Sequence, residues 1–240
     1  MTLSAEALNL PGRLDGISLT LQPGELTAIV GPNGAGKSSL LACLAGLLVG
    51  GEVCLDGLPL DDVHPHDRAK AIGFLPQTPE VAWDVTVETL VALGRLPWPG
   101  ATGGEAIETA IAAMDLEHLR ARRVSRLSGG ERARVLLARV LAGEPRWLLA
   151  DEPLANLDLA HAAALMGKLR GQARDGRGVV VVLHDLAAAM NHADRVVVLD
   201  SGVIAADGTP AEALTPTLIG AVWKVSARWL GEPGARALSF

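Results

Sequence analysis

This sequence lacks the concentrated positive charge of a nucleic-acid-binding protein. The formal net charge of its 240 residues is −6, the isoelectric point is near 5.5, and no block of like charges stands out. This counts against general DNA or RNA binding, and no nucleic-acid partner is expected. Acidity does not exclude a nucleotide, because a local glycine-rich loop can hold phosphate groups against its backbone N–H groups.

Long apolar runs and cysteines are also scarce. The longest early apolar stretch, 40–49, is too short to span a bilayer, and the first residues lack the basic region and apolar run of a signal peptide. The two cysteines, Cys43 and Cys54, lie in apolar or strand-like settings, where a buried free thiol is expected. These absences predict a protein of a reducing cytosol, which reaches a membrane only through a partner.

What the sequence does contain is apolar residues in short continuous runs. Hydrophobic residues make up 49% of the chain, which allows a sizeable core in one large domain or in a core with a subdomain. Continuous runs that do not alternate with polar residues are typical of parallel strands buried on both faces, and helical patterns separate them here. The sequence therefore predicts an α/β fold with a mainly parallel sheet, whose strands lie at 27–30, 147–150, 179–183 and 196–199.

Other segments predict parts attached to this core. Residues 17–21 alternate in polarity and 53–55 run into a turn, so we expect both to be antiparallel strands. We expect helices at 40–48 and 105–119, the second within a long stretch without a strong strand pattern. We interpret the whole chain, 1–240, as one domain with a catalytic core and its antiparallel β part at 1–77 and 146–210, an inserted α-helical subdomain at 78–145, and a C-terminal helical tail at 211–240.

A glycine-rich segment between the first buried strand and the first helix predicts a nucleotide site. It matches the pattern G-x-x-x-x-G-K-S in the strand–loop–helix context that this pattern requires. Backbone N–H groups of such a loop surround a β-phosphate, its lysine supplies a cation for the β- and γ-phosphates, and its serine supplies a hydroxyl for Mg²⁺. The expected ATP-binding residues are Gly31, Pro32, Asn33, Gly34, Ala35, Gly36, Lys37, Ser38 and Ser39.

Polar side chains follow the other buried runs. Asp151 and Glu152 come at the end of 147–150, where Asp151 is expected to hold Mg²⁺ and Glu152 to polarise the attacking water. His184 follows 179–183 and can donate to the γ-phosphate or orient the water. Gln77 can touch Mg²⁺ or water without adding charge. Alone, the acid pair and Gln77 could be ordinary solvated residues, but a complete phosphate loop favours the functional interpretation.

A second glycine pair lies in the segment Leu127-Ser128-Gly129-Gly130-Glu131. Ser128 is expected to cap a helix at 129–141, which Gly143 and Pro145 end. Paired glycines behind a small hydroxyl let backbone N–H groups approach an anion. The chain is therefore expected to hold two phosphate-facing surfaces.

In this order, the motifs resemble those of the ATP-binding subunits of ABC transporters, and the resemblance covers nearly the whole chain. It implies a P-loop NTPase fold that hydrolyses ATP with Mg²⁺, and a dimer whose two copies close head to tail around two ATP molecules. The signature of one copy would cap the ATP on the Walker A loop of the other. The resemblance assigns Walker A to 31–38, the Q-loop to Gln77, the signature to 127–131, Walker B and its catalytic acid to Asp151 and Glu152, the D-loop to Asn156, Leu157 and Asp158, and the switch histidine to His184.

The same resemblance implies partners and a location. The expected partners are a second ATPase subunit, integral membrane permease subunits and a periplasmic or surface substrate-binding protein, with the chain cytoplasmic and peripheral on the inner face of the cell membrane. Residues 91–97 and 213–216 resemble segments of the ATPases that serve importers of iron-siderophores, haem and cobalamin. Trp83, Trp98 and the apolar residues between them either receive a short helix of the membrane subunit or simply pack. The alternatives are an exporter ATPase and a soluble ABC ATPase not tied to transport.

The chain departs from the family pattern at two places. Glu131 replaces the commoner glutamine of the signature, and we expect its carboxylate to point away from the γ-phosphate. The family usually stacks the adenine on an aromatic side chain near the N-terminus, yet this chain has no tyrosine and no aromatic residue before Phe74. Arg13 could stack on the base instead, and Leu10 could contact it, so weak base selectivity is expected.

Overall fold

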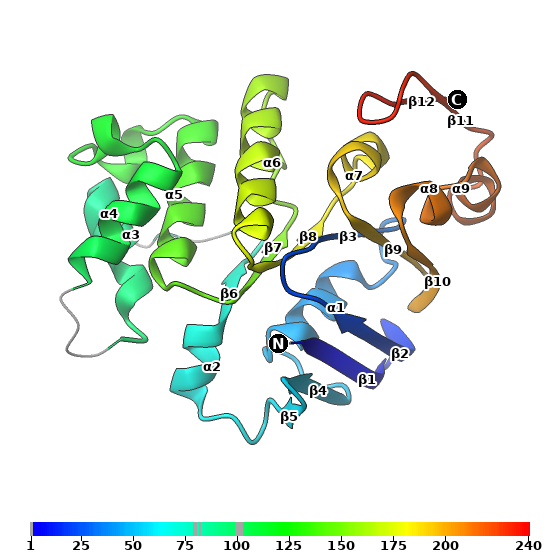
Figure 1. Cartoon of the computed structure of the whole chain (residues 1–240), viewed down its shortest axis with the longest axis horizontal. Helices are drawn as coiled ribbons and strands as arrows, with labels where there is room; N and C mark the ends of the chain where they lie inside the picture. Colours follow the sequence, from blue (N-terminus) through cyan, green and yellow to red (C-terminus); the bar gives the residue numbers. More distant parts are fainter. Residues whose placement is uncertain (1, 79–80, 82, 99–102) are drawn as a thin grey trace.

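A six-stranded sheet forms the centre of the molecule. The computed structural model describes residues 2–78, 81, 83–98 and 103–240 (Figure 1). The strand order is β10-β9-β3-β8-β7-β6, with parallel pairing from β9 to β6 and β10 antiparallel to β9. The predicted α/β fold with a mainly parallel sheet is confirmed. The strands are β3 Leu26–Val30, β6 Ile72–Leu75, β7 Trp147–Asp151, β8 Gly178–Val182, β9 Arg195–Asp200 and β10 Val203–Gly208.

The central strands are apolar throughout because both of their faces are covered. Every residue of β3, β7 and β8 is buried. Successive residues of a strand point to opposite faces, so Val179 and Val181 join one core cluster while Val180 and Val182 join the other. The first cluster continues into the inserted helices and α6, and the second continues into α1 and the N-terminal strands. This two-sided burial is what the continuous apolar runs predicted.

An antiparallel sheet covers one side of this core. Its strand order is β2-β1-β4-β5, and the expected strands at 17–21 and 53–55 fall within β2 and β4. Helix α1 (Lys37–Leu44) follows β3 and packs against both the central sheet and β1. The strands of this second sheet are β1 Leu3–Leu10, β2 Leu14–Leu21, β4 Glu52–Leu55 and β5 Leu58–Pro59.

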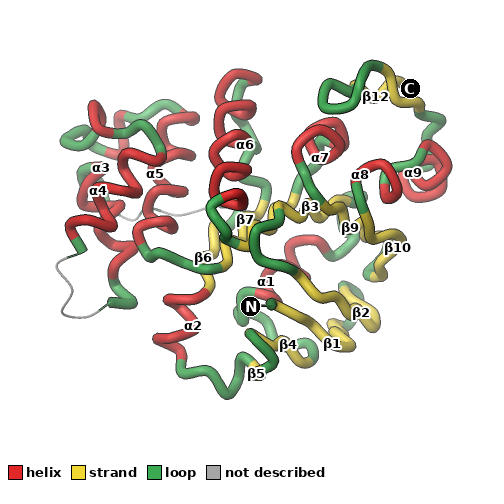
Figure 2. Tube along the Cα trace, in the orientation of Figure 1, coloured by secondary structure: helices red, strands yellow, loops and turns green. Residues whose placement is uncertain are grey.

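The inserted helices form a group beside the sheet, and α6 lies next to this group (Figures 1 and 2). This group contains α3 Val87–Ala92, η1 Leu93–Arg95, α4 Gly104–Ala113, η2 Glu117–Leu119, η3 Val124–Arg126 and α5 Gly129–Ala142. The remaining elements are α2 Pro65–Ala71, α6 Leu159–Arg174, α7 Leu186–His192, α8 Pro210–Ala213, α9 Pro216–Trp223, β11 Arg228–Leu230 and β12 Ala237–Ser239. None of the helices built from the described residues is long and apolar enough to cross a membrane.

Three expected helices differ from the observed ones at their ends. The helix at 40–48 stops at Leu44, because Gly46 takes a left-handed φ of +68°, and Val49 is left 80% exposed. The helix at 105–119 stops at Ala113, and Asp115 turns the chain with a φ of +52°. The tail is helical only to Trp223. Left-handed Lys224 ends α9, after which β11 and β12 pair as an antiparallel hairpin.

Candidate nucleotide-binding site

The site lies where the carboxyl ends of three parallel strands meet. Residues 31–36 form the loop from β3 to α1, and Lys37, Ser38 and Ser39 open α1. Asp151 ends β7 with Glu152 directly after it, and His184 lies two residues beyond β8. Parallel pairing of β3, β8 and β7 brings these ends to one edge of the sheet, where α/β proteins bind ligands.

Gly36 lets the phosphate loop and the β1–β2 turn come together. Its φ of +98° is left-handed, and a Cβ at this position would lie 2.4 Å from the carbonyl oxygen of Arg13. No larger residue fits this close approach. The consequence is that Arg13, although distant from the loop in the sequence, becomes part of the wall of the nucleotide cleft.

The ammonium group of Lys37 lies inside the phosphate loop and contacts its backbone. Its Nζ donates hydrogen bonds to the carbonyl oxygens of Gly31 and Pro32, both at 2.9 Å. Burial lowers the pKa of Lys37, and the nearby carboxylates of Glu152 and Asp151 only partly oppose this effect. The ammonium group is therefore a desolvated cation that a phosphate would stabilise.

Ser38 and Asp151 form the oxygen-rich part of the site. The Ser38 Oγ donates to the Asp151 Oδ1 at 3.2 Å. Asp151 is only 6% exposed, and burial raises the pKa of its carboxyl more than the hydrogen bond from Ser38 lowers it. A hydroxyl and a carboxylate are the hard oxygen ligands that Mg²⁺ accepts, in company with water and phosphate oxygens. Among the described residues there is no cluster of three or more His, Cys, Asp or Glu that could hold a metal ion.

Glu152 joins Gln77 and His184 into one contact group. Its Oε2 accepts a hydrogen bond from Gln77 Nε2 at 2.6 Å, and its Oε1 lies 2.5 Å from His184 Nε2. Glu152 also has a φ of +49°, a conformation that non-glycine residues rarely adopt and that is often found at functional sites. Two side chains that follow β6 and β8 are thus held around the Glu152 carboxylate, which follows β7 and faces the cleft.

Most of these groups line one cleft of about 670 Å³, although Asp151 is not part of its wall. Four residues of the phosphate loop, both serines, the Glu152 contact group and Arg13 contribute to the wall, whereas Leu10, the other residue suggested for the base, does not. The sequence offered no signal to choose between these two, because the choice depends on how the β1–β2 turn meets Gly36. The lining residues are Arg13, Asn33, Gly34, Gly36, Lys37, Ser38, Ser39, Gln77, Glu152 and His184.

Replacement of Asp151 by asparagine should raise the unfolding temperature of the nucleotide-free protein. A carboxyl whose pKa is raised by folding destabilises the folded state when it ionises, so the penalty is present at neutral pH and disappears as the pH falls below its unfolded value. Thermal unfolding from pH 4 to pH 8 measures the difference. The exposed Asp61→Asn change is the control, and equal stability of D151N and wild type at pH 8 would contradict the argument.

The second glycine pair begins α5 with a reciprocal cap. The Ser128 Oγ accepts from the backbone N–H of Glu131 at 3.3 Å, and the Glu131 Oε2 accepts from the backbone N–H of Ser128 at 2.8 Å. Arg122 lies 3.1 Å from the other carboxylate oxygen of Glu131. These contacts lower the pKa of Glu131, the hydrogen bond from the Ser128 backbone most of all. The unusual acid is a capping residue, and the spacing Ser128-x-x-Glu131 already contained that signal.

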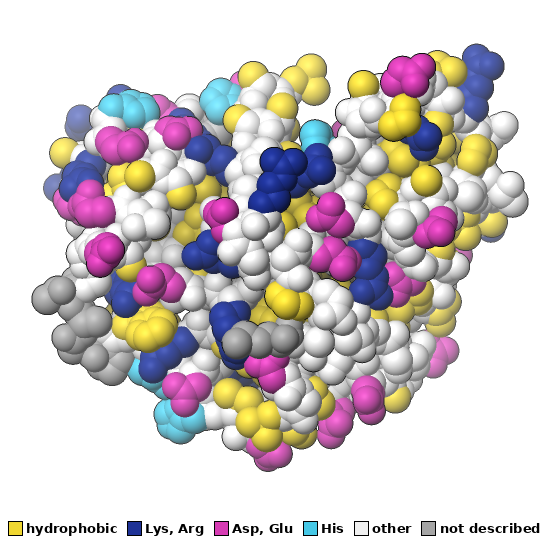
Figure 3. Space-filling model, viewed as in Figure 1, with side chains coloured by type: hydrophobic (Ala, Val, Ile, Leu, Met, Phe, Trp, Pro, Cys, Tyr) yellow, Lys and Arg dark blue, Asp and Glu magenta, His cyan; other side chains and the backbone are white. Residues whose placement is uncertain are grey.

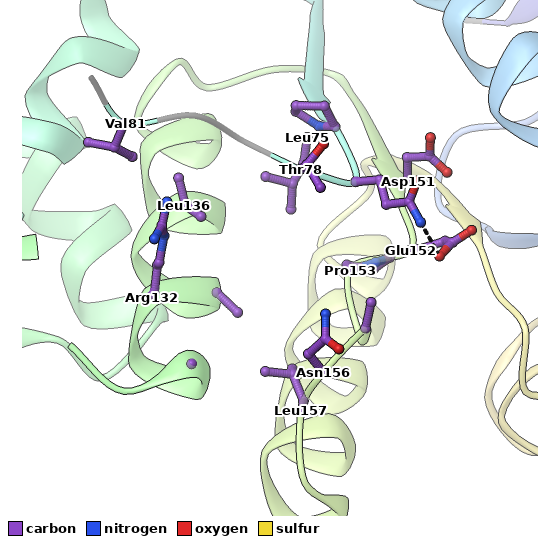
Figure 4. A pocket seen from close by; sticks show the side chains of 15 residues that line it. Leu75, Thr78, Val81, Arg132, Leu136, Asp151, Glu152, Pro153, Asn156 and Leu157 are labelled. Carbon is purple, nitrogen blue, oxygen red and sulfur yellow. Dashed lines mark hydrogen bonds between the residues drawn. The ribbon is translucent and has the colours of Figure 1, made fainter. Parts of the chain in front are cut away.

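This turn does not face the phosphate loop of its own chain. Gly129 instead lines a neighbouring cleft of about 610 Å³, which lies between α5 and the segment after β7 (Figure 4). Gln77 and Glu152 line both clefts, whereas Lys37 and Ser38 line only the first. The two expected phosphate-facing surfaces are therefore separate within one chain.

The segment 156–158 connects β7 to α6. Asn156 has a left-handed φ of +61°, and Asp158 caps α6 by accepting from the backbone N–H of His161 at 2.9 Å. Leu157 packs against the core, while Leu159 is 91% exposed. His161, which also contacts the Asp158 carboxylate through its ring, was not among the residues that the sequence singled out.

A hollow lies near the segment expected to receive a partner helix, but the two tryptophans do not line it. A hollow of about 390 Å³ lies between β6, η1 and α5, and Leu93, Leu96 and Pro97 are among its walls. Trp98 donates its indole N–H to the Gly143 carbonyl at 2.9 Å, with Lys70 and Arg95 on its ring at 4.8 and 4.9 Å. For Trp98 the packing interpretation therefore holds. Trp83 is exposed and lies outside the hollow.

Figure 3 shows how the charged side chains are distributed over one face of the molecule. Acidic and basic side chains are interspersed over the face shown in Figure 3, without a continuous field of one sign. A polyanion would find no extended positive track on this face.

Comparisons with known proteins agree with this geometry. The family model described as "ABC transporter" matches residues 14–155. The hemin import ATP-binding protein HmuV of Nocardia farcinica is 49% identical over 226 residues, which cover 92% of this chain and 78% of that protein. HmuV of Streptomyces coelicolor is 42% identical over 96% of this chain and 85% of its own length. The dimeric post-hydrolysis state of the ATP-binding cassette MJ0796, bound to ADP and Pi, matches with a TM-score of 0.75 and 27% identity over 87% of this chain and 98% of that chain.

Proposed function

This chain belongs to the ABC transporter family and is the ATP-hydrolysing subunit of a membrane importer, and we propose that the cargo of this importer is hemin. The observation that carries the cargo proposal is the 49% identity with a hemin import ATP-binding protein across 92% of the chain. Several relatives share that name, among them the HmuV proteins of Streptomyces coelicolor and Bordetella avium. Relatives named for import favour import over the export and non-transport alternatives.

The subunit works as a dimer and joins membrane permease subunits. Its two expected phosphate-facing surfaces explain the need for a second copy, because Gly129 lines a different cleft from Lys37 and Ser38. We propose that the turn at 127–131 of one copy contacts the γ-phosphate of ATP on the phosphate loop of the other. The N-terminus of α5 directs backbone N–H groups toward that anion, with the capping contacts of Glu131 keeping its carboxylate on its own backbone.

Hydrolysis in this proposal depends on positioned charges. Lys37 leaves its loop carbonyls for the β- and γ-phosphates, which offer a better partner for a desolvated ammonium group. Glu152 accepts a proton from the attacking water, and His184 and Gln77 hold the carboxylate in place until the water arrives. His184 then donates to the γ-phosphate. The strained backbone at Glu152 keeps its side chain on the cleft.

Mg²⁺ fits the oxygen set at the head of α1. The ion would be held by the hydroxyl of Ser38, the carboxylate of Asp151 and the amide oxygen of Gln77, together with phosphate oxygens of the nucleotide. When bound, it would neutralise charge on the β- and γ-phosphates. The raised pKa of Asp151 supports this assignment, because a cation beside the buried carboxylate would remove the penalty for its ionisation.

The hollow between β6, η1 and α5 is the surface proposed for a short helix of the permease. It adjoins the nucleotide machinery through Leu75 and Pro76, which precede Gln77 and also line the cleft beside α5. A helix placed there would respond to movement of the Gln77 segment. The permease places this subunit on the inner, cytoplasmic face of the cell membrane, and a periplasmic or surface binding protein delivers hemin from the other side.

Reconstitution of the complete importer tests the cargo. The chain would be co-expressed with candidate permease and binding-protein genes from the same genome, purified as a complex and placed in liposomes. We expect the binding protein loaded with hemin to stimulate ATP hydrolysis several-fold, with cobalamin and ferric siderophores giving no stimulation. Stimulation by cobalamin or a siderophore alone would overturn the hemin proposal. Failure of any permease to co-purify would overturn the proposed partner.

A further inference from the structure

Gly130 is confined by its own chain. A Cβ at this position would lie 2.3 Å from Cδ2 and 2.6 Å from Cγ of the His161 imidazole, distances at which an atom must move. At the neighbouring Gly129 the nearest atom would be 3.9 Å away. Gly130 lies in the first turn of α5 without a left-handed φ, so its backbone would accept alanine. It is the His161 ring, rather than the backbone conformation, that leaves no room for a side chain.

The His161 ring is itself held in place. Its Nδ1 lies 2.8 Å from both carboxylate oxygens of Asp158, and its backbone N–H donates to one of them at 2.9 Å. Asp158 is the cap of α6 and the last residue of the 156–158 segment. The ring therefore connects the capping residue of α6 with the first turn of α5.

This contact joins two parts of the molecule, in addition to their shared hydrophobic core and the ion pair between Lys168 of α6 and Asp115. Helix α5 belongs to the inserted helices, whereas α6 follows directly from β7 of the central sheet. The 610 Å³ cleft separates α5 from the segment after β7, and both Gly129 and Asn156 line it (Figure 4). Since Gly130 follows Gly129 directly, the His161 contact lies at the edge of this cleft and sets how α5 meets α6.

We propose that His161 is a positioning residue. It packs on Gly130 and binds Asp158, and so keeps the 127–131 turn and the 156–158 segment in a fixed position relative to each other. The inference rests on the proposed function, in which the 127–131 turn serves ATP on the partner copy. It assigns a within-chain role to the second signature glycine. Because Gly130 has no side chain, the His161 ring can lie against it. This contact within the chain is separate from any contact that the Gly130 backbone makes with a phosphate across the dimer.

A double-mutant cycle on the full-length protein separates the two roles of Gly130. The G130A change should lower the unfolding temperature of the nucleotide-free chain, because overpacking destabilises a folded protein. It should also reduce ATP turnover by about tenfold, because the added methyl group displaces the His161 ring or the 127–131 turn. In the H161A background the same change should no longer lower the unfolding temperature, because the ring is gone and alanine suits a helix better than glycine. The double variant should therefore turn over ATP faster than G130A alone.

Two other glycine-to-alanine changes serve as controls for the double-mutant cycle. Gly167 lies on the exposed side of α6 with no atom within 4 Å of an added Cβ, so G167A should leave both unfolding and turnover unchanged. G129A tests a glycine of the same turn that meets no clash within the chain, and H161A should not rescue any loss of turnover that it causes. Rescue of both G129A and G130A would indicate a general effect of H161A and would overturn the specific contact.

The contact between His161 and Asp158 is tested by measuring kcat and ATP affinity in addition to stability. In H161N the amide can still donate to Asp158 while the ring is removed, and in H161F the ring remains without the donor. We expect H161F to lower kcat several-fold and to leave the affinity of the monomer for ATP unchanged. Only the 127–131 turn and the 156–158 segment change their relative position, and the phosphate loop of the same copy is unaffected. H161N should keep more of the wild-type kcat than H161A.

The outcomes discriminate among three failures. If G130A and H161A act additively on unfolding, the contact does not exist in solution and the inference is wrong. If they interact in unfolding but not in turnover, His161 only packs and the positioning role is overturned. If the wild-type protein hydrolyses no ATP, the proposed function itself fails, while the unfolding cycle still reports on the contact between Gly130 and His161.

Discussion

Substitution of Glu152 by glutamine should lower steady-state ATP hydrolysis by about a hundredfold or more, the loss typical of removing one group that acts on the transition state. Glutamine has nearly the same shape and can still bond to Gln77 and His184, so the cleft keeps its walls. It cannot accept a proton from water, so bound ATP should remain intact and hold two copies together. Hydrolysis is measured by phosphate release, and the trapped dimer by size-exclusion chromatography with ATP.

A matched acid-to-amide change shows whether the effect is specific to that carboxylate. Glu131→Gln removes a charge from the α5 cap but leaves an oxygen that can accept from the Ser128 backbone, so it should reduce hydrolysis far less. Turnover near the wild-type rate in E152Q would remove Glu152 from its proposed role. Lost ATP binding in E152Q would point to a disturbed cleft instead of a missing base.

Arginine in place of Ser128 should abolish formation of the ATP-trapped dimer in the E152Q protein and reduce hydrolysis of the otherwise unchanged protein by at least about a hundredfold. The side chain of Ser128 lies at the start of α5, where a partner's phosphate is expected to dock, and arginine fills that space. Gly129, the residue next to Ser128, and the phosphate loop line different clefts, so a single copy should still bind ATP with its usual affinity.

The S128A change is the control for the lost cap. Alanine removes the hydroxyl that accepts from Glu131, which costs about 1 kcal/mol of stability at an N-cap, but adds no bulk. It should therefore lower the unfolding temperature without eliminating the dimer. Binding of a fluorescent ATP analogue to the S128R monomer provides the remaining test, because weakened binding there would contradict the assignment of this turn to the partner's nucleotide.

The sequence predicted those parts of the fold whose cause is local. Valine-rich runs such as 179–182 predicted strands covered on both faces, and each lies in the central sheet. The loop pattern ending in Lys37 and Ser38 predicted a phosphate site between a strand and a helix, which is where the loop lies. The local sequence pattern did not predict where two of the helices end. Gly46 and Lys224 take left-handed conformations, so neighbouring residues that fit a helical pattern lie outside the helix.

The candidate site was predictable as a set of residues but not as a set of contacts. No local pattern indicated that the side chains of Gln77 and His184 would meet on Glu152, because this contact depends on the order of β6, β7 and β8 in the sheet. Nothing near His161 in the sequence indicated that its ring would lie on Gly130, since that contact joins two helices 31 positions apart. By contrast, the capping role of Glu131 is a local pattern that the sequence did contain.

The wall that Gln77 and Glu152 share between the two clefts has a practical consequence. Any event that moves these two side chains changes the shape of both hollows at once. A small molecule lodged beside α5 would therefore interfere with hydrolysis without competing for the phosphate loop, and its inhibition would persist at saturating ATP. Compounds selected for that kinetic behaviour would act on a surface formed partly by Arg132 and Val81, away from the glycine-rich loop that many unrelated ATPases have in common.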